Sequence, residues 1–275
     1  MVARMSAGIL FIDLDGTLVG PDGIVERVWP ALDALRAAGW RLAICTGRPG
    51  RGIALATARR LDPEGLHVFE SGGVVMHGSG RVIDHHPLDP RAVTALAAVA
   101  LAEDVTLEAY TADARFLCRA KDDFIRGHEA LLGFEAELSS WPPADPLVRM
   151  QWVVPHARWP ALASAAASAM SLVAPHHGRS PKMPGVAFVS MTAPGVSKGT
   201  GVRRVLAHLG LDKEHAAMAG DDLNDLSAFD EVGRTFAPED GHQEVRARAT
   251  EVIPSAARGG VADAAASLLE GSPTR

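Results

Sequence analysis

The sequence predicts an α/β protein whose parallel-sheet core is interrupted by an inserted α+β domain. In the first and last thirds of the 275-residue chain, short apolar runs alternate with amphipathic helix patterns, as in parallel sheets connected by helices. The middle third has strand patterns without a regular helix between them. We therefore expect a core made of residues 1–83 and 185–275, and an insert at 84–184.

The first third contains three predicted strands and a helix. Residues 8–13 (GILFID) form a continuous apolar run that ends in acids, which is typical of a parallel strand buried on both faces. Apolar residues recur at helical spacing over 28–38, and Gly39 suits the C-terminal cap of that helix. Residues 41–45 (RLAIC) and 67–71 (HVFES) are the second and third predicted strands.

The last third repeats this pattern, whereas the middle third does not. Apolar residues over 202–209 predict a helix that ends at Gly210, and residues 216–220 and 251–254 predict two more strands. Within the insert we expect strands at 105–110, 115–120, 147–154 and 171–175, helices near 91–102, 122–132 and 157–170, and a core that includes Trp141, Trp152 and Trp159.

Composition indicates an ordinary soluble globular protein, with 47% hydrophobic and 22% charged residues. A net charge of -6 and the lack of a long basic run give no reason to expect nucleic-acid binding. The apolar stretch before Asp13 is too short for a signal peptide or a membrane span. We expect a cytoplasmic protein without membrane contact, either a monomer or a homodimer, with Cys45 and Cys118 as reduced thiols.

Polar residues follow the carboxyl ends of several predicted strands. Asp13 and Asp15 follow the first strand, and Thr46 and Gly47 follow the second. Lys198 begins the helix before a later strand, which is followed by Asp221, Asp222, Asn224 and Asp225. Ligands of open parallel sheets bind beyond the carboxyl ends of the strands, so these groups are expected to converge on one crevice.

Converging carboxylates repel one another and resist desolvation, so such a cluster requires a cation or a shared proton. A few hard oxygen ligands without His or Cys suit Mg²⁺, which keeps several waters and commonly also binds a substrate phosphate. A lysine, a threonine hydroxyl and exposed backbone amides supply the other groups that a phosphate needs. The pattern predicts a Mg²⁺-assisted phosphoryl-transfer site.

Four segments, FIDLDGTLV, ICTGR, VSKG and GDDLND, occur in that order along the chain. They resemble the four motifs of the haloacid dehalogenase superfamily, and more narrowly of its Cof-type phosphatases, over essentially the whole chain. The resemblance implies a Rossmann-like core with a large α+β (C2B-like) cap between the second and third motifs. It also implies a Mg²⁺-dependent phosphatase of a small phosphorylated metabolite, with a sugar phosphate as one candidate, that works through an aspartyl-phosphate.

The resemblance also implies roles for individual residues. Asp13 attacks phosphorus, and Asp15 protonates the leaving oxygen and then activates the hydrolytic water. An Asp13 oxygen, the backbone carbonyl of Asp15 and Asp221 ligate Mg²⁺. Lys198 neutralises charge on the nucleophile and on the phosphate.

The remaining motif residues are assigned to the phosphate and to its surroundings. Thr46 and the backbone amides of Leu14 and Gly47 hold phosphate oxygens, and Asn224 contacts the phosphate as well. Asp225 orients the motif lysine or a metal-bound water.

The chain departs from the subfamily after the third predicted strand, where Ser71-Gly72-Gly73 replaces the usual Asn-Gly-Ala. A short polar group is kept there and the amide is lost, which leaves the substrate contact at Ser71 open. We expect Asp222 to be a solvated loop residue. Arg48 and Arg51 either reach the substrate or lie in solvent.

Residues 174–182 are the most polar part of the insert. Their cationic and imidazole side chains are His176, His177, Arg179 and Lys182. We favour a polar loop near the hinge, with contact to an anionic or hydroxyl-rich substrate as the alternative. The other histidine pair, His85 and His86, has no carboxylate or cysteine at useful spacing, so a zinc site is not expected.

Two other functions remain open. Related capped proteins use the same aspartyl-phosphate to move phosphate within a sugar, so a phosphosugar mutase is the enzymatic alternative. A non-catalytic sensor of a phosphorylated ligand is the other alternative, although a site without catalysis has no physical reason to keep clustered acids.

Overall fold

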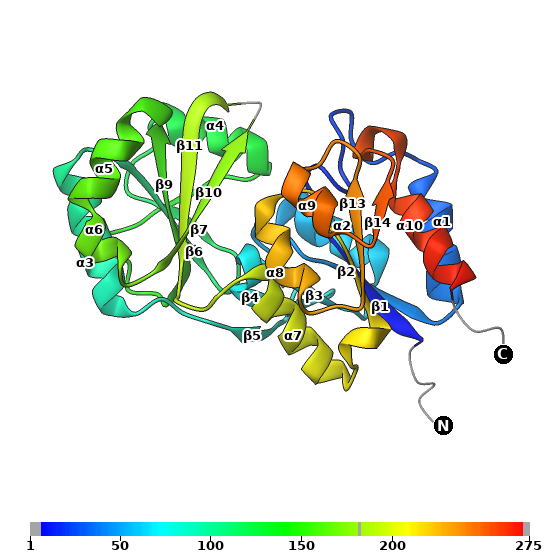
Figure 1. The fold of residues 1–275 in the computed structure, drawn as a ribbon. Helices are drawn as coiled ribbons and strands as arrows, with labels where there is room; N and C mark the ends of the chain where they lie inside the picture. The colour runs from blue at the N-terminus through cyan, green and yellow to red at the C-terminus, as the bar shows by residue number, and fades with distance from the viewer. Residues whose placement is uncertain (1–6, 181–182, 272–275) are drawn as a thin grey trace.

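The computed structural model describes residues 7–180 and 183–271. The main sheet has five parallel strands in the order β14-β13-β12-β1-β2, which confirms the predicted parallel α/β fold. Figure 1 shows this sheet in one lobe and a second sheet in the other. The strands of the parallel sheet are β1 (Gly8–Ile12), β2 (Trp40–Ile44), β12 (Ala216–Ala219), β13 (Arg234–Pro238) and β14 (Glu251–Ile253).

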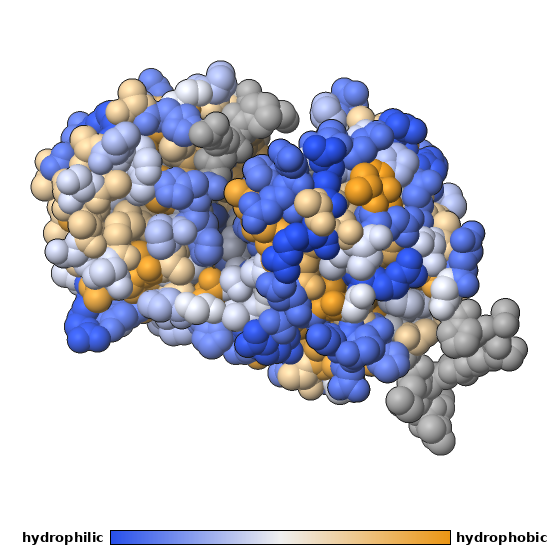
Figure 2. Space-filling model, in the orientation of Figure 1, coloured by the Kyte–Doolittle hydropathy of each residue, from blue (hydrophilic) through white to orange (hydrophobic). Residues whose placement is uncertain are grey.

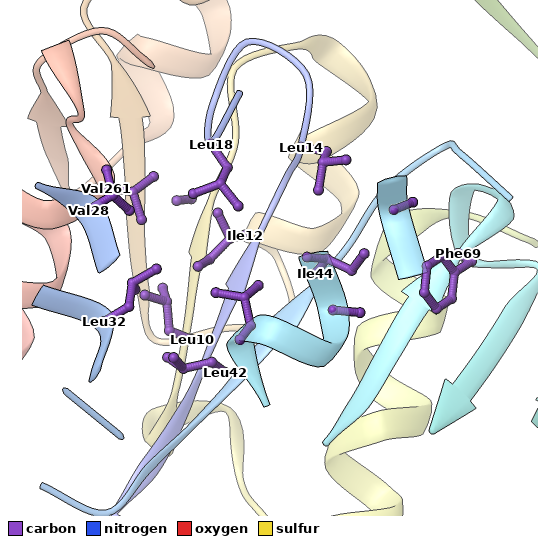
Figure 3. Close-up of a cluster of buried hydrophobic side chains, with 14 of the residues drawn as sticks. Leu10, Ile12, Leu14, Leu18, Val28, Leu32, Leu42, Ile44, Phe69 and Val261 are labelled. Carbon is purple, nitrogen blue, oxygen red and sulfur yellow. The ribbon is translucent and has the colours of Figure 1, made fainter. Parts of the chain in front are cut away.

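Helices cover both faces of the parallel sheet, which explains why β1 is apolar at every position. Leu10 and Ile12 pack in one cluster with α1 (Val28–Ala37), α2 (Gly52–Leu61) and α10 (Val261–Glu270), as Figure 3 shows for the labelled side chains. Ile9 and Phe11 point to the opposite face, because side chains alternate along a strand. That face is covered by α7 (Lys198–Leu209), α8 (Leu226–Phe229) and α9 (Gln243–Arg248).

A small antiparallel sheet continues from the edge of β2. It consists of β3 (Leu66–Phe69), β4 (Val74–His77) and β5 (Val82–His85). The predicted third strand is therefore present, but it pairs mainly with β4. One parallel bridge between Cys45 and Val68 and the bond from Thr46 N to the Val68 carbonyl (3.0 Å) join β3 to the segment that follows β2.

The insert contains the six-stranded sheet β10-β11-β9-β6-β7-β8. Trp152 is fully buried against α3, α5 and α6, and Trp141 and Trp159 pack on the same cluster, as expected. The strands of the insert are β6 (Thr106–Thr111), β7 (Phe116–Cys118), β8 (Glu137–Leu138), β9 (Leu147–Pro155), β10 (Ala174–Ser180) and β11 (Met183–Thr192). Its helices are α3 (Pro90–Ala102), α4 (Asp123–Leu132), α5 (Trp159–Ala165) and α6 (Ala167–Met170).

Two details of the insert differ from the sequence predictions. The strand predicted at 171–175 begins at Ala174 and runs to Ser180, so the described part of the expected 174–182 loop is a strand. The polar residues of this segment favoured the prediction of a loop. They are compatible with a strand because β10 lies at the edge of its sheet. The single helix predicted at 157–170 is divided into α5 and α6.

The expected boundaries of the insert, 84 and 184, fall inside strands β5 and β11. Asp84 pairs with Val75 in the small sheet, and β11 continues beyond 184 as a partner of β9 up to Met191. The apolar strand β11 was absent from the sequence-based strand predictions.

The insert packs directly on the core through apolar side chains. Phe69 and Met76 from the small sheet belong to one buried cluster with Phe116, Leu132 and Val148 of the insert. In Figure 2 the visible face is hollowed between the two lobes and carries mostly hydrophilic residues. No helix within the described residues is long and apolar enough to cross a bilayer.

Candidate active site

The turn after β1 brings Asp13 to the end of the parallel sheet. The backbone N–H of Asp13 donates to the Ala219 carbonyl (2.9 Å), so the end of β1 is paired with the end of β12. Gly16 has φ +89°, and a Cβ on it would stand 2.3 Å from a carboxylate oxygen of Asp221. Only glycine allows this close approach, which places the turn directly beside Asp221.

Lys198 is the first residue of α7, and its ammonium lies between two carboxylates. Ser197 begins the helix with a capping box, in which its hydroxyl accepts from the Thr200 N–H. Lys198 Nζ donates to Asp13 Oδ1 (2.7 Å) and to Asp225 Oδ1 (2.6 Å). The predicted association of Lys198 with Asp13 and Asp225 is present, and all three side chains are buried.

Both carboxylate oxygens of Asp225 accept hydrogen bonds from neighbouring groups. Its second oxygen, Oδ2, accepts from the backbone N–H groups of Asp221 (3.0 Å) and Asp222 (3.1 Å). The side chain of Asp222 is exposed and accepts from the Leu223 N–H, so Asp222 caps the short turn after β12. The expected solvated position of Asp222 is therefore confirmed.

Asp13, Asp221 and Asp225 form an acidic cluster, with one oxygen of each within 4.8 Å of the others. Both oxygens of Asp225 already have hydrogen-bond partners, which leaves Asp13 and Asp221 as the carboxylates available to a cation. Asp221 Oδ1 accepts from the Thr17 hydroxyl (2.7 Å), which orients it. The Asp15 carboxylate is outside this cluster, which fits a backbone rather than a side-chain role for Asp15 at a metal.

The electrostatics of the cluster indicate an excess of negative charge. Burial raises the pKa of Asp13 well above its usual range, and the charge of Lys198 opposes this shift. Burial also raises the pKa of Asp221 to about 6, against the hydrogen bond from Thr17. Burial by itself lowers the pKa of Lys198, but Asp13 and Asp225 outweigh it and raise that pKa. A bound cation would relieve the repulsion among the carboxylates.

Asp15 lies at the entrance of the site and is paired with Arg48. Arg48 donates through Nε to Asp15 Oδ2 (2.7 Å) and through a terminal nitrogen to Oδ1 (2.6 Å). The Asp15 side chain is 54% exposed, so its carboxylate can contact a ligand. Arg48 is thus half-buried on Asp15, whereas Arg51 lies over the ring of Phe134 at 4.8 Å.

The segment after β2 and the turn after β3 support each other. Thr46 is buried, and its hydroxyl accepts from the Arg48 N–H (3.1 Å). The Ser71 N–H donates to the Thr46 carbonyl (3.0 Å), and the Ser71 hydroxyl stands 3.2 Å from the place of a Cβ on Gly47. The departure at Ser71 therefore lies directly beside the predicted phosphate-binding loop.

A cleft of about 290 Å³ lies between these strand-end loops and the insert. The residues that line it from the core are Asp15, Gly47, Arg48, Ser71 and Asn224, so the predicted acid and two predicted phosphate contacts face it. The side chain of Leu14 is buried in the core cluster, which leaves only its backbone for a ligand. The residues that line the cleft from the insert are His128, Leu131, Leu132, Arg149, Gln151, His176, His177, Phe188 and Ser190.

Most of the insert residues at the cleft were missed by sequence reasoning. Arg149 and Gln151 alternate with apolar residues in β9, and buried polar residues two apart on one strand are a signal that they share a face. His128 gives no such signal, because it is a single histidine in an amphipathic helix. Its position depends on how α4 packs against the sheet.

The predicted polar segment 174–182 reaches the cleft only in part. His176 and His177 line the cleft, and His177 also packs its ring against Trp159 at 4.7 Å. Burial lowers the pKa of His176, and the charge of Arg149 acts in the same direction. The Arg179 side chain and Lys182 lie outside the described part of the structure.

Comparisons with known proteins identify the family and the fold. A family profile described as haloacid dehalogenase-like hydrolase matches residues 10–264. Among curated protein sequences, none matches the chain. Solved structures with the same fold include a haloacid dehalogenase-like hydrolase from Bacteroides thetaiotaomicron (21% identity, 95% of this chain and 99% of the other, TM-score 0.83).

Two further structures are similar over nearly their whole length. The protein TM0651 from Thermotoga maritima is 17% identical, over 94% of this chain and 97% of the other, with a TM-score of 0.81. BT4131, described as a subclass IIB sugar phosphatase of the same superfamily, is 21% identical, over 95% of this chain and 98% of the other, with a TM-score of 0.77.

Proposed function

Because the chain belongs to the haloacid dehalogenase-like hydrolase family, we propose that it is a Mg²⁺-dependent phosphatase of a small phosphorylated metabolite. The observation that carries the proposal is the buried ammonium of Lys198 between Asp13 and Asp225, next to a cleft lined by Asp15. A sugar phosphate is the leading candidate substrate, since the similar protein BT4131 is described as a sugar phosphatase.

In this proposal Asp13 is the nucleophile and Asp15 is the acid and base. A carboxylate oxygen of Asp13 forms a bond to phosphorus while the bond from phosphorus to the leaving oxygen breaks, and Asp15 gives its proton to that oxygen. Water then attacks the aspartyl-phosphate, Asp15 takes a proton from this water, and phosphate leaves with Asp13 restored. The open position of Asp15 at the cleft supports this role.

Asp13, Asp221 and the backbone carbonyl of Asp15 are the proposed Mg²⁺ ligands. The acidic cluster fits a hard divalent cation, because it contains only oxygen donors and carries more negative charge than Lys198 balances. When bound, the cation supplies charge stabilisation for the phosphoryl oxygens. Lys198 would share this task, and Asp225 positions it.

The phosphate contacts of the proposal come from two loops. Thr46, with the backbone N–H groups of Leu14 and Gly47, holds phosphate oxygens, and Asn224 contacts the phosphate from the loop after β12. Gly47 and Asn224 line the cleft. The hydrogen bonds around Thr46 and Ser71 would keep this loop in place before the substrate binds.

The insert acts in this proposal as a cap that excludes water and selects the leaving group. We place the cap domain between β5 and the end of β11, with the core on either side of it. We further propose a cytoplasmic monomer or homodimer that has neither nucleic acid nor a membrane as its partner.

Phosphate release from a panel of sugar phosphates, nucleotides and cofactor phosphates, with Mg²⁺ and with EDTA, tests the proposal. We expect metal-dependent release that is concentrated on one class of ester. Accumulation of a phosphorylated isomer without free phosphate would indicate a mutase. Binding of a phosphorylated compound without turnover would indicate a sensor.

A further inference from the structure

A row of polar side chains crosses the sheet of the insert where it faces the cleft. The strand register places His176 of β10 opposite Ser190 of β11, Ser190 opposite Gln151 of β9, and Gln151 opposite Glu108 of β6. Residues opposite each other in neighbouring strands point to the same face. This polar row thus lies on one face, while the other face of the sheet packs on α3, α5 and α6.

Glu108 ends this row as a fully buried carboxylate with three side-chain donors. It accepts from Gln151 Nε2 (2.7 Å), from the Tyr110 hydroxyl (3.0 Å) and from His128 Nδ1 (2.8 Å). Because Nδ1 of His128 faces a carboxylate, it carries a hydrogen, and Nε2 is the remaining polar atom of the ring. Among the described residues, no hydrogen bond to this Nε2 is found.

The ring of His128 is also fixed by its neighbours. Its centroid lies 4.9 Å from that of Phe188 and 5.7 Å from that of Phe116. The residue lines the same cleft as Asp15. An oriented imidazole that is held by a buried acid and has one polar atom left over is arranged as a ligand-binding group.

Two side chains on this side of the cleft, Arg149 and His128, each have an acidic partner. Arg149 Nε forms an ion pair with Glu70 Oε2 (2.5 Å), and the guanidinium lies over the Tyr110 ring at 4.0 Å. His128 Nδ1 lies 2.8 Å from a carboxylate oxygen of Glu108. A second anionic group on a ligand would therefore find no unpaired cation among these residues, whereas hydroxyl groups could both donate and accept.

We propose that His128, oriented by Glu108, is a specificity-determining residue whose Nε2 hydrogen-bonds an uncharged, hydroxyl-bearing leaving group of the phosphate ester. This inference rests on the proposed phosphatase function. The volume of the cleft, about 290 Å³, is at the small end of small-molecule sites, so a leaving group of monosaccharide size fits better than a nucleoside.

The test compares two classes of ester in the full-length protein. kcat/KM is measured for hexose and pentose monophosphates and for phenyl phosphate. The leaving group of phenyl phosphate carries no hydroxyl besides the ester oxygen itself. The variants are His128→Asn, whose amide lies near the Nδ1 position and can still bond Glu108, and His128→Gln, whose amide reaches the Nε2 position. His208→Gln is the matched control, because His208 is exposed and about 15 Å along α7 from Lys198.

We expect His128→Asn to lower the ratio of sugar-phosphate to phenyl-phosphate kcat/KM by about fivefold or more. His128→Gln should restore part of this ratio, and His208→Gln should not change it. If His128 is purely structural, His128→Asn should be tolerated better than His128→Gln, and each variant should change kcat/KM for both esters by the same factor. That result would overturn this inference but not the proposed function. If the wild type releases phosphate from no ester, the proposed function fails and this inference fails with it.

Discussion

The two sides of the cleft differ in how their charges are arranged. On the strand-end side, the ammonium of Lys198 lies between Asp13 and Asp225, and Asp221 adds a third carboxylate to the cluster. On the insert side, Arg149 is paired with Glu70 and His128 with Glu108. A cluster with excess negative charge is suited to binding a cation and a charged reacting group. A face whose charged side chains are paired is suited to binding an uncharged part of a ligand.

The largest effect is expected where the charge is least balanced. Lys198→Met removes the ammonium between Asp13 and Asp225 and should lower kcat/KM by a factor on the order of 10² to 10³. Lys213→Met, at an exposed lysine, is the matched control and should behave as the wild type does. Steady-state phosphate release measures both, and near-normal turnover by Lys198→Met would contradict the role of the buried ammonium.

On the balanced side, removing one member of a pair should affect stability strongly. Arg149→Met leaves the Glu70 carboxylate buried without its cation and should lower the free energy of unfolding by about 3–5 kcal/mol near pH 8. The double variant Glu70→Gln/Arg149→Met should recover most of this loss. Urea unfolding of the wild type, Arg149→Met, Glu70→Gln and the double variant measures the coupling between the two residues. Strictly additive losses of the free energy of unfolding would show that the pair is not coupled.

The same pair predicts a pH dependence of stability. Burial raises the pKa of Glu70 to about 7, and the nearby charges of Arg149 and His128 oppose this shift. The folded state therefore binds more protons than the unfolded state between about pH 4.5 and 7. The stability of the wild type relative to Glu70→Gln should fall as the pH rises through this window, and urea unfolding at several pH values would contradict this if the difference stayed constant or grew.

A smaller effect is expected at the partly exposed pair between Asp15 and Arg48. Arg48→Lys keeps the charge but loses the two parallel hydrogen bonds to the carboxylate. The free energy of unfolding should change by less than about 1 kcal/mol, because the pair faces solvent. Any loss of activity should appear in kcat, since Asp15 is held less firmly. A large decrease in the free energy of unfolding, measured in urea, would show that the pair is structural.

The two sides of the cleft also differed in how far sequence could predict them. Asp13 and Asp221 follow strands of the parallel sheet and Lys198 begins the helix before β12, and the carboxyl ends of such strands meet at one edge. Their convergence could therefore be predicted from their positions along the chain. The additional pairing of Arg48 with Asp15 could not, because both lie in loops.

On the insert side, function depends on register between strands that are distant in sequence. Gln151 meets Glu108 and Ser190 only because β9 pairs with both β6 and β11 in one particular alignment. A strand was predicted only as far as Pro175, and a loop was favoured for the rest of β10, because its polar residues conceal a strand that pairs along one side only. Long-range pairing of this kind leaves little trace in local composition.

The most direct test of the account is Mg²⁺-dependent phosphate release by Asp13→Asn beside Asp222→Asn. Both variants replace an acid by an isosteric amide, but only Asp13 contacts Lys198. We expect Asp13→Asn to lose turnover by a factor on the order of 10⁴ or more, while Asp222→Asn, whose amide can still cap the turn, should stay within about threefold of the wild type. Turnover by a folded Asp13→Asn protein at the wild-type rate would contradict the assignment of Asp13 as nucleophile.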